Sequence, residues 1–213
     1  MINPDISLEK SFWEKGFKNI AGVDEAGRGP WAGPLTAACV VIHSKTQVVP
    51  GVRDSKKMTK NQREKAFAKI CKRSSAFGIG VVSQKVIDTI GIQKAVRKAV
   101  LKAIRKMKVD FEIDVSYVLV DGSKTLSLGS YNSQRIKKGG LLHYSISAAS
   151  ILAKVTRDRI MKKFAITYPQ YGFENHVGYG TREHIKALQT HGACPVHRKS
   201  FAPIKKILSL TSY

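Results

Sequence analysis

Residues 20–30 read IAGVDEAGRGP, in which a short apolar run leads into two adjacent carboxylates, Asp24 and Glu25. The apolar run predicts a strand over 18–26, and LTAACVVIH predicts a second strand over 35–43. The intervening GRGPWAGP is dense in glycine and proline, which indicates a loop that closes a wide hairpin. The stretch therefore places an acid pair at the end of a strand, against a flexible backbone.

The charge of the whole chain contrasts with this acid pair. The 213 residues include 37 Lys and Arg but 15 Asp and Glu, which gives a formal net charge of +22. The imbalance is spread along the chain, and a polyanionic partner such as a nucleic acid is the natural inference. The alternative is a basic protein that is merely soluble.

Composition also bears on the compartment. Hydrophobic residues make up 43% of the chain, enough for a sizeable core, and no apolar run is long enough to cross a bilayer. The N-terminus lacks the apolar segment of a signal peptide. Cys39, Cys71 and Cys194 are widely spaced and odd in number, which argues against a disulfide framework and against zinc. We therefore expect a soluble cytoplasmic protein with no membrane partner.

Periodicity predicts further elements on both sides of the acid pair. A helix is expected to begin after Thr59 as its N-cap, and a long helix to begin near Ser145 or Ser147 as a possible cap. The remaining expected elements are a helix over 7–16, strands over 77–83 and 115–121, a helix over 92–107, and a small C-terminal lobe of loop and helix. Strands that first form a meander and then alternate with helices predict an α/β fold with a mixed sheet.

The helix expected over 92–107 has a strongly basic outer face. Its apolar residues follow helical spacing, and the opposite face carries Lys94, Arg97, Lys98, Lys102, Arg105 and Lys106. A solvated helix face is favoured over phosphate contact at every one of these residues. The face nevertheless adds to the positive field of the protein.

Carboxylates end two of the expected strands. Asp24 closes the first and Asp121 closes another, so the two side chains converge on one sheet edge if these strands are neighbours. Paired acids in a positive field indicate a hard divalent cation bound through oxygen, and such ions serve phosphoryl chemistry. The alternative for a single Asp at a strand end is a turn or cap residue.

Several motifs recur in the order and approximate spacing of one family. They are AGVDEAGRGPWAGP at 21–34, RDSKKMT at 53–59, VDG at 120–122, SISAASILAKVTRDR at 145–159 and GYGT at 178–181. Over nearly its whole length the chain resembles ribonuclease HII. The resemblance implies a ribonuclease H-like mixed sheet flanked by helices, with a catalytic domain over 1–165 and a C-terminal loop and helical substrate-binding extension over 166–213.

The resemblance also implies an activity. The family cuts the RNA strand of RNA–DNA hybrids and incises 5′ to single ribonucleotides in duplex DNA, leaving a 5′-phosphate and a 3′-hydroxyl, with Mn²⁺ or Mg²⁺. A monomer is expected. One alternative is a protein that binds RNA–DNA hybrids but has lost catalysis. Another is the related ribonuclease HIII type, which is disfavoured because only about twenty residues precede the first expected strand.

Matching motifs assign the site residues. Asp24, Glu25 and Asp121 match the catalytic metal ligands. The substrate-binding residues implied are Gly27, Arg28 and Gly29 at the ribose 2′-hydroxyl, Tyr179 at the RNA–DNA junction, and Lys56 and Lys57 at phosphate. Ser147 shares a helix face with Ser150 and Lys154, which suits phosphate contact or a core or capping role.

Two positions depart from the family pattern. Gly140, in KKGGLLHYSIS, stands where the family usually has its fourth active-site carboxylate, and Gly91 stands where an Asn is common. Three expected carboxylates remain. Asp158 is expected to pair with neighbouring arginines and is a weak candidate for a replacement acid.

Overall fold

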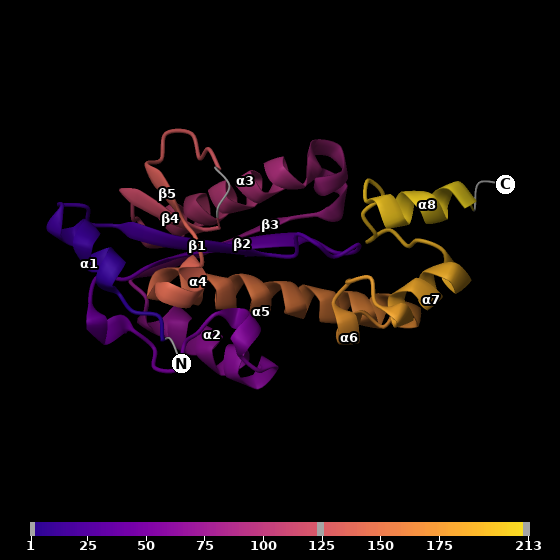
Figure 1. The fold of residues 1–213 in the computed structure, drawn as a ribbon, viewed down its shortest axis with the longest axis horizontal. Helices are drawn as coiled ribbons and strands as arrows, with labels where there is room; N and C mark the ends of the chain where they lie inside the picture. Colours follow the sequence, from indigo (N-terminus) through magenta and orange to yellow (C-terminus); the bar gives the residue numbers. More distant parts are fainter. Residues whose placement is uncertain (1–2, 123–125, 211–213) are drawn as a thin grey trace.

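A five-stranded sheet with helices on both faces forms the body of the protein, and a smaller lobe extends from one end (Figure 1). The computed structural model describes residues 3–122 and 126–210. The strands are β1 (Ile20–Ala26), β2 (Leu35–Val41), β3 (Ala76–Val82), β4 (Tyr117–Asp121) and β5 (Ser133–Ile136). The α-helices are α1 (Ser7–Glu14), α2 (Lys60–Arg73), α3 (Gln84–Phe111), α4 (Gly139–Leu142), α5 (Tyr144–Thr167), α6 (Phe173–His176), α7 (Arg182–His191) and α8 (Ala202–Leu210). Short 3₁₀ helices are η1 (Lys45–Gln47), η2 (Ser55–Lys57) and η3 (Pro169–Tyr171).

The sheet has the order β3-β2-β1-β4-β5 and is mixed, as the sequence predicted. The β1–β2 and β2–β3 pairs are antiparallel, whereas the β1–β4 and β4–β5 pairs are parallel. Val23 pairs with Val120, so Asp24 and Asp121 follow the last paired residues at one edge. The expected convergence of these two carboxylates is therefore confirmed, and it results from a parallel pairing between strands far apart in the sequence.

Helices cover the two faces of the sheet separately. α3 packs on one face, while α2 and α5 pack on the other, as Figure 1 shows. The packing is close because glycine lies at the contact points. A Cβ at Gly80 would lie 2.0 Å from the carbonyl oxygen of Ala99 in α3, and a Cβ at Gly22 would lie 2.3 Å from the hydroxyl of Ser145 in α5. Larger side chains at these glycines would push the helices off the sheet.

Of the helix caps predicted from the sequence, the one for α2 is correct and the one for α5 is wrong. Thr59 caps α2 and forms a capping box with Gln62, as expected. The serine cap expected for α5 is wrong, because His143 occupies the N-cap position without a side-chain hydrogen bond. Ser145 donates to Glu9 Oε1 at 2.6 Å instead, and Ser147 donates to the carbonyl of Gly140 at 2.6 Å. Both serines are buried, so they serve tertiary contacts.

The long basic helix begins earlier than expected. α3 starts at Gln84 after a Ser83 cap, and Gly91 interrupts it with φ 76° and ψ 160°. The apolar periodicity that predicted the helix begins only after this interruption, at Ile92, which is why the first turns were missed. None of the helices within 3–122 and 126–210 has the length and apolar composition required to span a bilayer.

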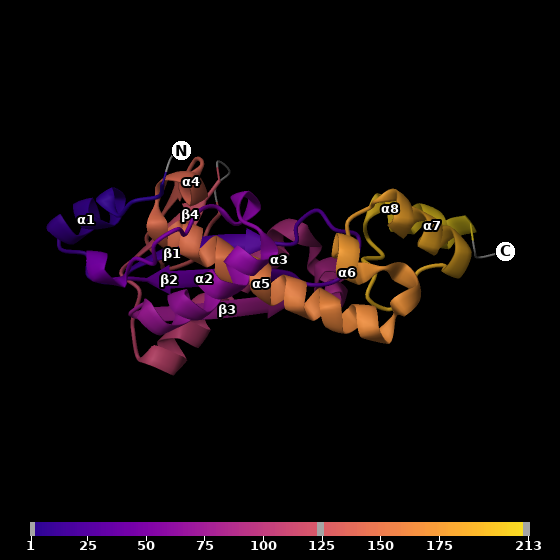
Figure 2. The ribbon, with the colours of Figure 1, turned by 90° about the horizontal axis from the view of Figure 1, so that it is seen from below.

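The C-terminal lobe has a core of its own, and Figure 2 shows α5 leading from the sheet into it. Met161 and Ala165 of α5 pack in this core with Phe173, Leu188 and Ile204. The expected domain boundary after residue 165 therefore lies within a continuous helix. The division itself and the substrate-binding role of 166–213 stay predictions.

Buried histidines link the lobe to the turn that carries Tyr179. Nδ1 of His197 accepts from the backbone N–H of Cys194 at 2.9 Å, so its Nε2 carries the proton and donates to Nε2 of His184, also at 2.9 Å. Nδ1–H of His184 then donates to the carbonyl of Tyr179 at 2.9 Å. This histidine relay requires both rings to be neutral, and burial lowers the pKa of each to about 4.

The relay predicts a loss of stability in mild acid. Each histidine has a pKa of about 4 in the folded protein, below the value of about 6.5 for an unfolded chain. The unfolded state therefore binds more protons between these values, so the contribution is complete above pH about 6.5 and falls by roughly 1.4 kcal/mol per pH unit for each histidine as pH drops. Urea unfolding followed from neutral pH downward measures this slope.

A pair of variants separates the relay from other acid-sensitive groups. His197→Gln should remove the contribution of one histidine, roughly 1.4 kcal/mol per pH unit, from the slope in this window. His191→Gln, at an exposed position, should leave the slope as in the wild type. Equal slopes in the two variants would contradict the relay.

Candidate active site

A pocket of about 230 Å³ opens at the edge of the sheet where β1 and β4 end. It brings together most of the residues that the sequence singled out. The lining includes Asp24, Glu25, Gly27, Arg28, Gly29, Lys56, Asp121 and Tyr179. Ser55, Lys154 and Arg157 complete the polar wall. The pocket thus combines acids, a glycine-rich loop, an aromatic ring and several cations.

Two expected substrate-binding residues do not line this pocket. Lys57 is exposed beside Lys56 in η2. Ser147 is fully buried in α5, and its hydroxyl is engaged by the carbonyl of Gly140. The structure therefore places Ser147 behind the site, where it positions Gly140, and the substrate roles of both residues stay predictions.

The carboxylates in the pocket repel one another. Burial, followed by the neighbouring charges of Glu25 and Asp121, holds the pKa of Asp24 well above its usual range, and Asp54 adds to the effect. The backbone N–H of Glu25 donates to Asp24 Oδ1 at 2.7 Å and partly offsets this. Oε1 of Glu25 pairs with Arg28 at 3.1 Å, whereas its buried Oε2 has no hydrogen-bond partner among the described residues. An unpaired buried oxygen beside crowded acids is unfavourable without a cation.

This donor set fits a hard divalent cation, since all the facing ligand atoms are carboxylate oxygens. Within the part of the chain that the structure describes, however, no group of three or more His, Cys, Asp and Glu side chains is gathered closely enough to hold an ion by itself. Mg²⁺ characteristically keeps several waters and shares its shell with substrate phosphates. The carboxylates therefore suit an ion that takes its remaining ligands from water and from a substrate phosphate.

Asp54 occupies the side of the site where Gly140 lacks a side chain. A Cβ at Gly140 would lie 3.5 Å from Asp54 Oδ2 and 4.0 Å from Asp24 Oδ2, and the N–H of Gly140 donates to Asp121 Oδ1 at 3.4 Å. The other oxygen of Asp54 accepts from the N–H of Lys56 at 2.8 Å and caps η2. Sequence reasoning missed this acid, because its motif looks like a capped turn in front of two lysines.

Asp158, the acid that the sequence offered as a weak replacement, lies outside this pocket and is already paired. Its oxygens contact Lys154 Nζ at 2.6 Å and Arg63 Nη2 at 3.6 Å. The expectation of pairing is correct, but the expected partners are wrong. Neighbouring arginines in a helix point in different directions, and here Arg157 turns inward while Arg159 pairs with Glu64.

Buried arginines fix the backbone of the loop between β1 and β2. Arg157 donates to the carbonyls of Pro34, Val177 and Ala32 at 2.9, 2.9 and 3.0 Å. Arg198 of the C-terminal lobe donates to the carbonyls of Gly27, Arg28, Gly33 and Pro34 at 2.6, 3.0, 3.0 and 3.2 Å. Burial lowers the pKa of Arg157 to about 10 and that of Arg198 to about 9. These two arginines with their seven hydrogen bonds, called here the arginine clamp, were not predicted from the sequence.

A third arginine, Arg135 of β5, contacts the main chain at the end of β4. It donates to the carbonyl of Asp121 at 2.7 Å, and its Nε is buried without a hydrogen-bond partner among the described residues. Burial lowers its pKa, and the carboxylates of Glu25 and Asp121 oppose that change. Gly122 leaves room for it, because a Cβ there would lie 2.5 Å from Arg135 Nη1.

Tyr179 forms the wall of the pocket that faces the glycine-rich loop. Its ring lies 3.6 Å from the position of a Cβ at Gly29, and 48% of the residue is exposed. The next residue, Gly180, packs so closely on Trp31 that a Cβ would lie 2.1 Å from the indole ring. The turn is thereby held against the loop, and the tyrosine ring stays free to contact a ligand.

Comparisons with known proteins agree on one family. The family model described as ribonuclease HII matches residues 21–204. A ribonuclease HII from Caldicellulosiruptor bescii is 49% identical over 203 residues, covering 95% of each chain, and one from Bacillus thuringiensis is 46% identical, covering 94% of this chain and 75% of that protein. The crystal structure of ribonuclease H2 from Pyrococcus horikoshii OT3 is similar with a TM-score of 0.74 and 27% identity, covering 90% of this chain and 98% of that one.

The arginine clamp predicts a large effect from one substitution. Arg198→Met keeps the aliphatic bulk but leaves the carbonyls of the loop without their donor, and we expect a loss of about 3 kcal/mol in unfolding free energy. For a chain of this size the melting temperature should fall by roughly 6–12 °C. Arg182→Met, at an exposed position of α7, should change the unfolding free energy by no more than about 0.5 kcal/mol. Equal melting temperatures for the two variants would show that the clamp contributes little.

Proposed function

Because the chain belongs to the ribonuclease HII family and is an endoribonuclease of the ribonuclease H type, dependent on divalent metal, we propose that Asp24, Glu25 and Asp121 are its catalytic metal ligands. The observation that supports this most directly is the parallel pairing of β1 with β4, which ends both strands in a carboxylate at the mouth of one pocket. Mn²⁺ or Mg²⁺ is the cofactor that such oxygen ligands suit.

The proposed substrates are RNA–DNA hybrids and duplex DNA that contains single ribonucleotides, incised on the 5′ side of the ribonucleotide. A divalent ion held by the carboxylates would activate water and stabilise the leaving oxygen, which gives a 5′-phosphate and a 3′-hydroxyl. Asp24 and Asp121 would hold that ion at the mouth of the pocket. Arg28 holds Glu25 in place through their ion pair of 3.1 Å.

Selection of RNA is assigned to the loop and to Tyr179. The main chain of Gly27, Arg28 and Gly29 is the proposed donor and acceptor for the 2′-hydroxyl. Gly29 has no Cβ, which lets a ribose approach the main chain there, whereas the missing Cβ at Gly27 makes room for Arg157. Tyr179 lies against Gly29 and can stack on the sugar of the next nucleotide. The hydroxyl is the group that distinguishes RNA from DNA at a given site, so these contacts are the proposed basis of discrimination.

The cations around the pocket are assigned to phosphate binding. Lys56 and Lys154 line the pocket, and Lys57 lies exposed beside it. They offset the negative charge of the carboxylates, which would otherwise repel the nucleic acid. We further propose that the protein acts as a monomer in the cytoplasm.

A duplex with one ribonucleotide tests the metal ligands. We expect Asp24→Asn and Asp121→Asn to lower cleavage by roughly a hundredfold or more, because each loses a charged ligand whose ion supplies several kcal/mol of transition-state stabilisation. Mapping the product ends to the nucleotide checks the incision site. Binding of the same duplex without metal should survive in both variants, since the carboxylates repel phosphate. Near-normal turnover at saturating metal would remove these residues from the mechanism.

The missing side chain at Gly140 leads to a prediction about the metal concentration that cleavage requires. A Cβ fits there at ordinary contact distances, and the φ of Gly140 is not in the left-handed region. We therefore expect Gly140→Asp to fold, to lower the Mn²⁺ concentration needed for half-maximal cleavage, and to enlarge the rise in melting temperature that Mn²⁺ produces without substrate.

Two variants serve as controls for this prediction. Gly140→Asn adds nearly the same volume without charge and should leave both metal titrations near those of the wild type. Asp54→Asn removes the acid that faces Gly140 and should raise the metal requirement. If Gly140→Asp and Gly140→Asn respond alike, charge at this position has no role in metal binding.

A further inference from the structure

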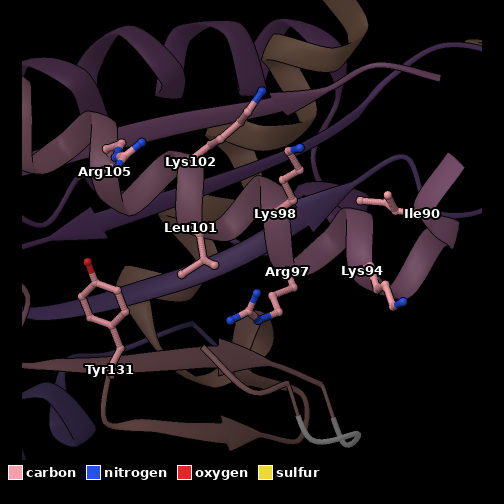
Figure 3. A pocket seen from close by; sticks show the side chains of 8 residues that line it. All are labelled: Ile90, Lys94, Arg97, Lys98, Leu101, Lys102, Arg105 and Tyr131. Carbon is pink, nitrogen blue, oxygen red and sulfur yellow. The ribbon is translucent and has the colours of Figure 1, made fainter. Parts of the chain in front are cut away.

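A second basic site lies on α3, away from the candidate active site. Its lining residues form a groove of about 760 Å³, and none of them is shared with the pocket between β1 and β4. They are Ile90, Lys94, Arg97, Lys98, Leu101, Lys102, Arg105 and Tyr131 (Figure 3). We call this feature the α3 groove.

Helical spacing arranges the cations of the α3 groove in two rows. Lys94, Lys98 and Lys102 follow one another at intervals of four residues, and Arg97 and Arg105 flank Leu101 in the same way. In Figure 3, Arg97 and Leu101 point to the side on which Tyr131 lies, while Lys98 and Lys102 extend from the other edge of the helix. The buried face of α3 fixes this orientation, because Ala95, Ala99 and their apolar neighbours pack against the sheet.

Several of these charges lack protein partners. Arg97 Nε donates to the carbonyl of Ser127 at 2.8 Å and Lys102 Nζ donates to that of Val81 at 3.1 Å, both neutral acceptors. In the described ranges, Lys94, Lys98 and Arg105 have no hydrogen-bond or ion-pair partner, and no acid lines the groove. Of the acids near the end of the helix, Asp110 pairs with Lys106 and Asp114 pairs with Lys108, and Glu112, at the C-cap, does not line the groove.

The length of the row of cations in the α3 groove matches the spacing of phosphates along a nucleic-acid backbone. From Lys94 to Arg105 a helix rises about 16 Å at roughly 1.5 Å per residue. Over that length one strand of a nucleic-acid duplex presents about five phosphate charges, at one per roughly 3.4 Å. The stems of the lysines and arginines, with Leu101 and Tyr131, form an apolar floor on which sugars can rest.

A bilayer suits the groove less well. Interfacial helices insert exposed aromatic or large aliphatic side chains between lipid headgroups. Among the described residues, the exposed large apolar side chains are Val81, Val109, Leu142, Ile166, Tyr179 and Ile185. None of these lines the α3 groove, so nothing there is available for insertion.

We propose that the α3 groove binds the phosphate backbone of a nucleic-acid segment outside the catalytic pocket. The site does no chemistry and makes no contact with bases. It adds sequence-independent affinity, which retains the enzyme on long duplexes while the catalytic pocket searches for a ribonucleotide.

The test removes the three unpartnered charges together. Lys94→Gln, Lys98→Gln and Arg105→Gln are combined in one variant, and Lys65→Gln, Lys69→Gln and Lys72→Gln on the exposed side of α2 form a control with the same change in net charge. Binding to a long DNA duplex without ribonucleotides is measured as a function of salt. The slope of log K against log salt should decrease by about 2.7 in the groove variant, at roughly 0.9 per phosphate contact, and by less than about 1 in the control.

Two further measurements show whether the nucleic acid contacts the α3 groove itself. The long duplex should protect Lys94 and Lys98 of the wild type from acetylation, which a long-range field alone does not do. Turnover on a hybrid just long enough to fill the catalytic pocket should be the same in the groove variant and the wild type, so the catalytic proposal is tested separately. Equal salt slopes in the groove variant and the control would overturn the inference. Protection of these lysines by vesicles of phosphatidylserine, but not by the duplex, would overturn it in favour of a lipid surface.

Discussion

Buried guanidinium groups that donate to backbone carbonyls hold the loop between β1 and β2, and the candidate active site depends on them. Arg157 reaches the loop from α5 and Arg198 reaches it from the C-terminal lobe. Among the described residues neither forms an ion pair with a carboxylate. Backbone carbonyls therefore replace the water that each cation loses, and the ring of Phe201, 5.0 Å from the guanidinium of Arg198, adds to this. Because the carbonyls of Gly27 and Arg28 face inward to Arg198, the opposite side of this backbone is left to face the pocket.

The carboxylates pose the opposite electrostatic problem. Asp24, Glu25 and Asp121 converge because strands β1 and β4 are parallel neighbours, and Asp54 adds a fourth charge from η2. Arg28 compensates only part of this repulsion. A divalent ion held at the proposed site would relieve this repulsion, and its binding should stabilise the folded state by mass action. Occupancy of the proposed metal site would thus be coupled to the stability of this edge of the sheet.

Local signals in the sequence predicted much of this arrangement. The hairpin around GRGPWAGP, the Thr59 cap and the convergence of two strand ends follow from turn chemistry and periodicity, and the structure contains them. The residues that sequence reasoning missed act through distant contacts. Arg198 stands in a basic stretch that looks in sequence like any solvent-exposed basic segment. Its partners become evident only when the C-terminal lobe packs against the loop between β1 and β2. The prediction of a serine cap for α5 was wrong for a related reason, because the hydroxyls of Ser145 and Ser147 donate to Glu9 and to the carbonyl of Gly140.

The arginine clamp also sets an order of events during synthesis. Arg28 leaves the ribosome early, and Arg198 follows 170 residues later. At typical elongation rates of 5–20 residues per second that interval is roughly 10–30 s. During it the nascent chain already carries Asp24, Glu25 and later Asp121, but the loop lacks the donor that shapes its main chain. The loop therefore reaches the conformation described here only after residue 198 has been synthesised.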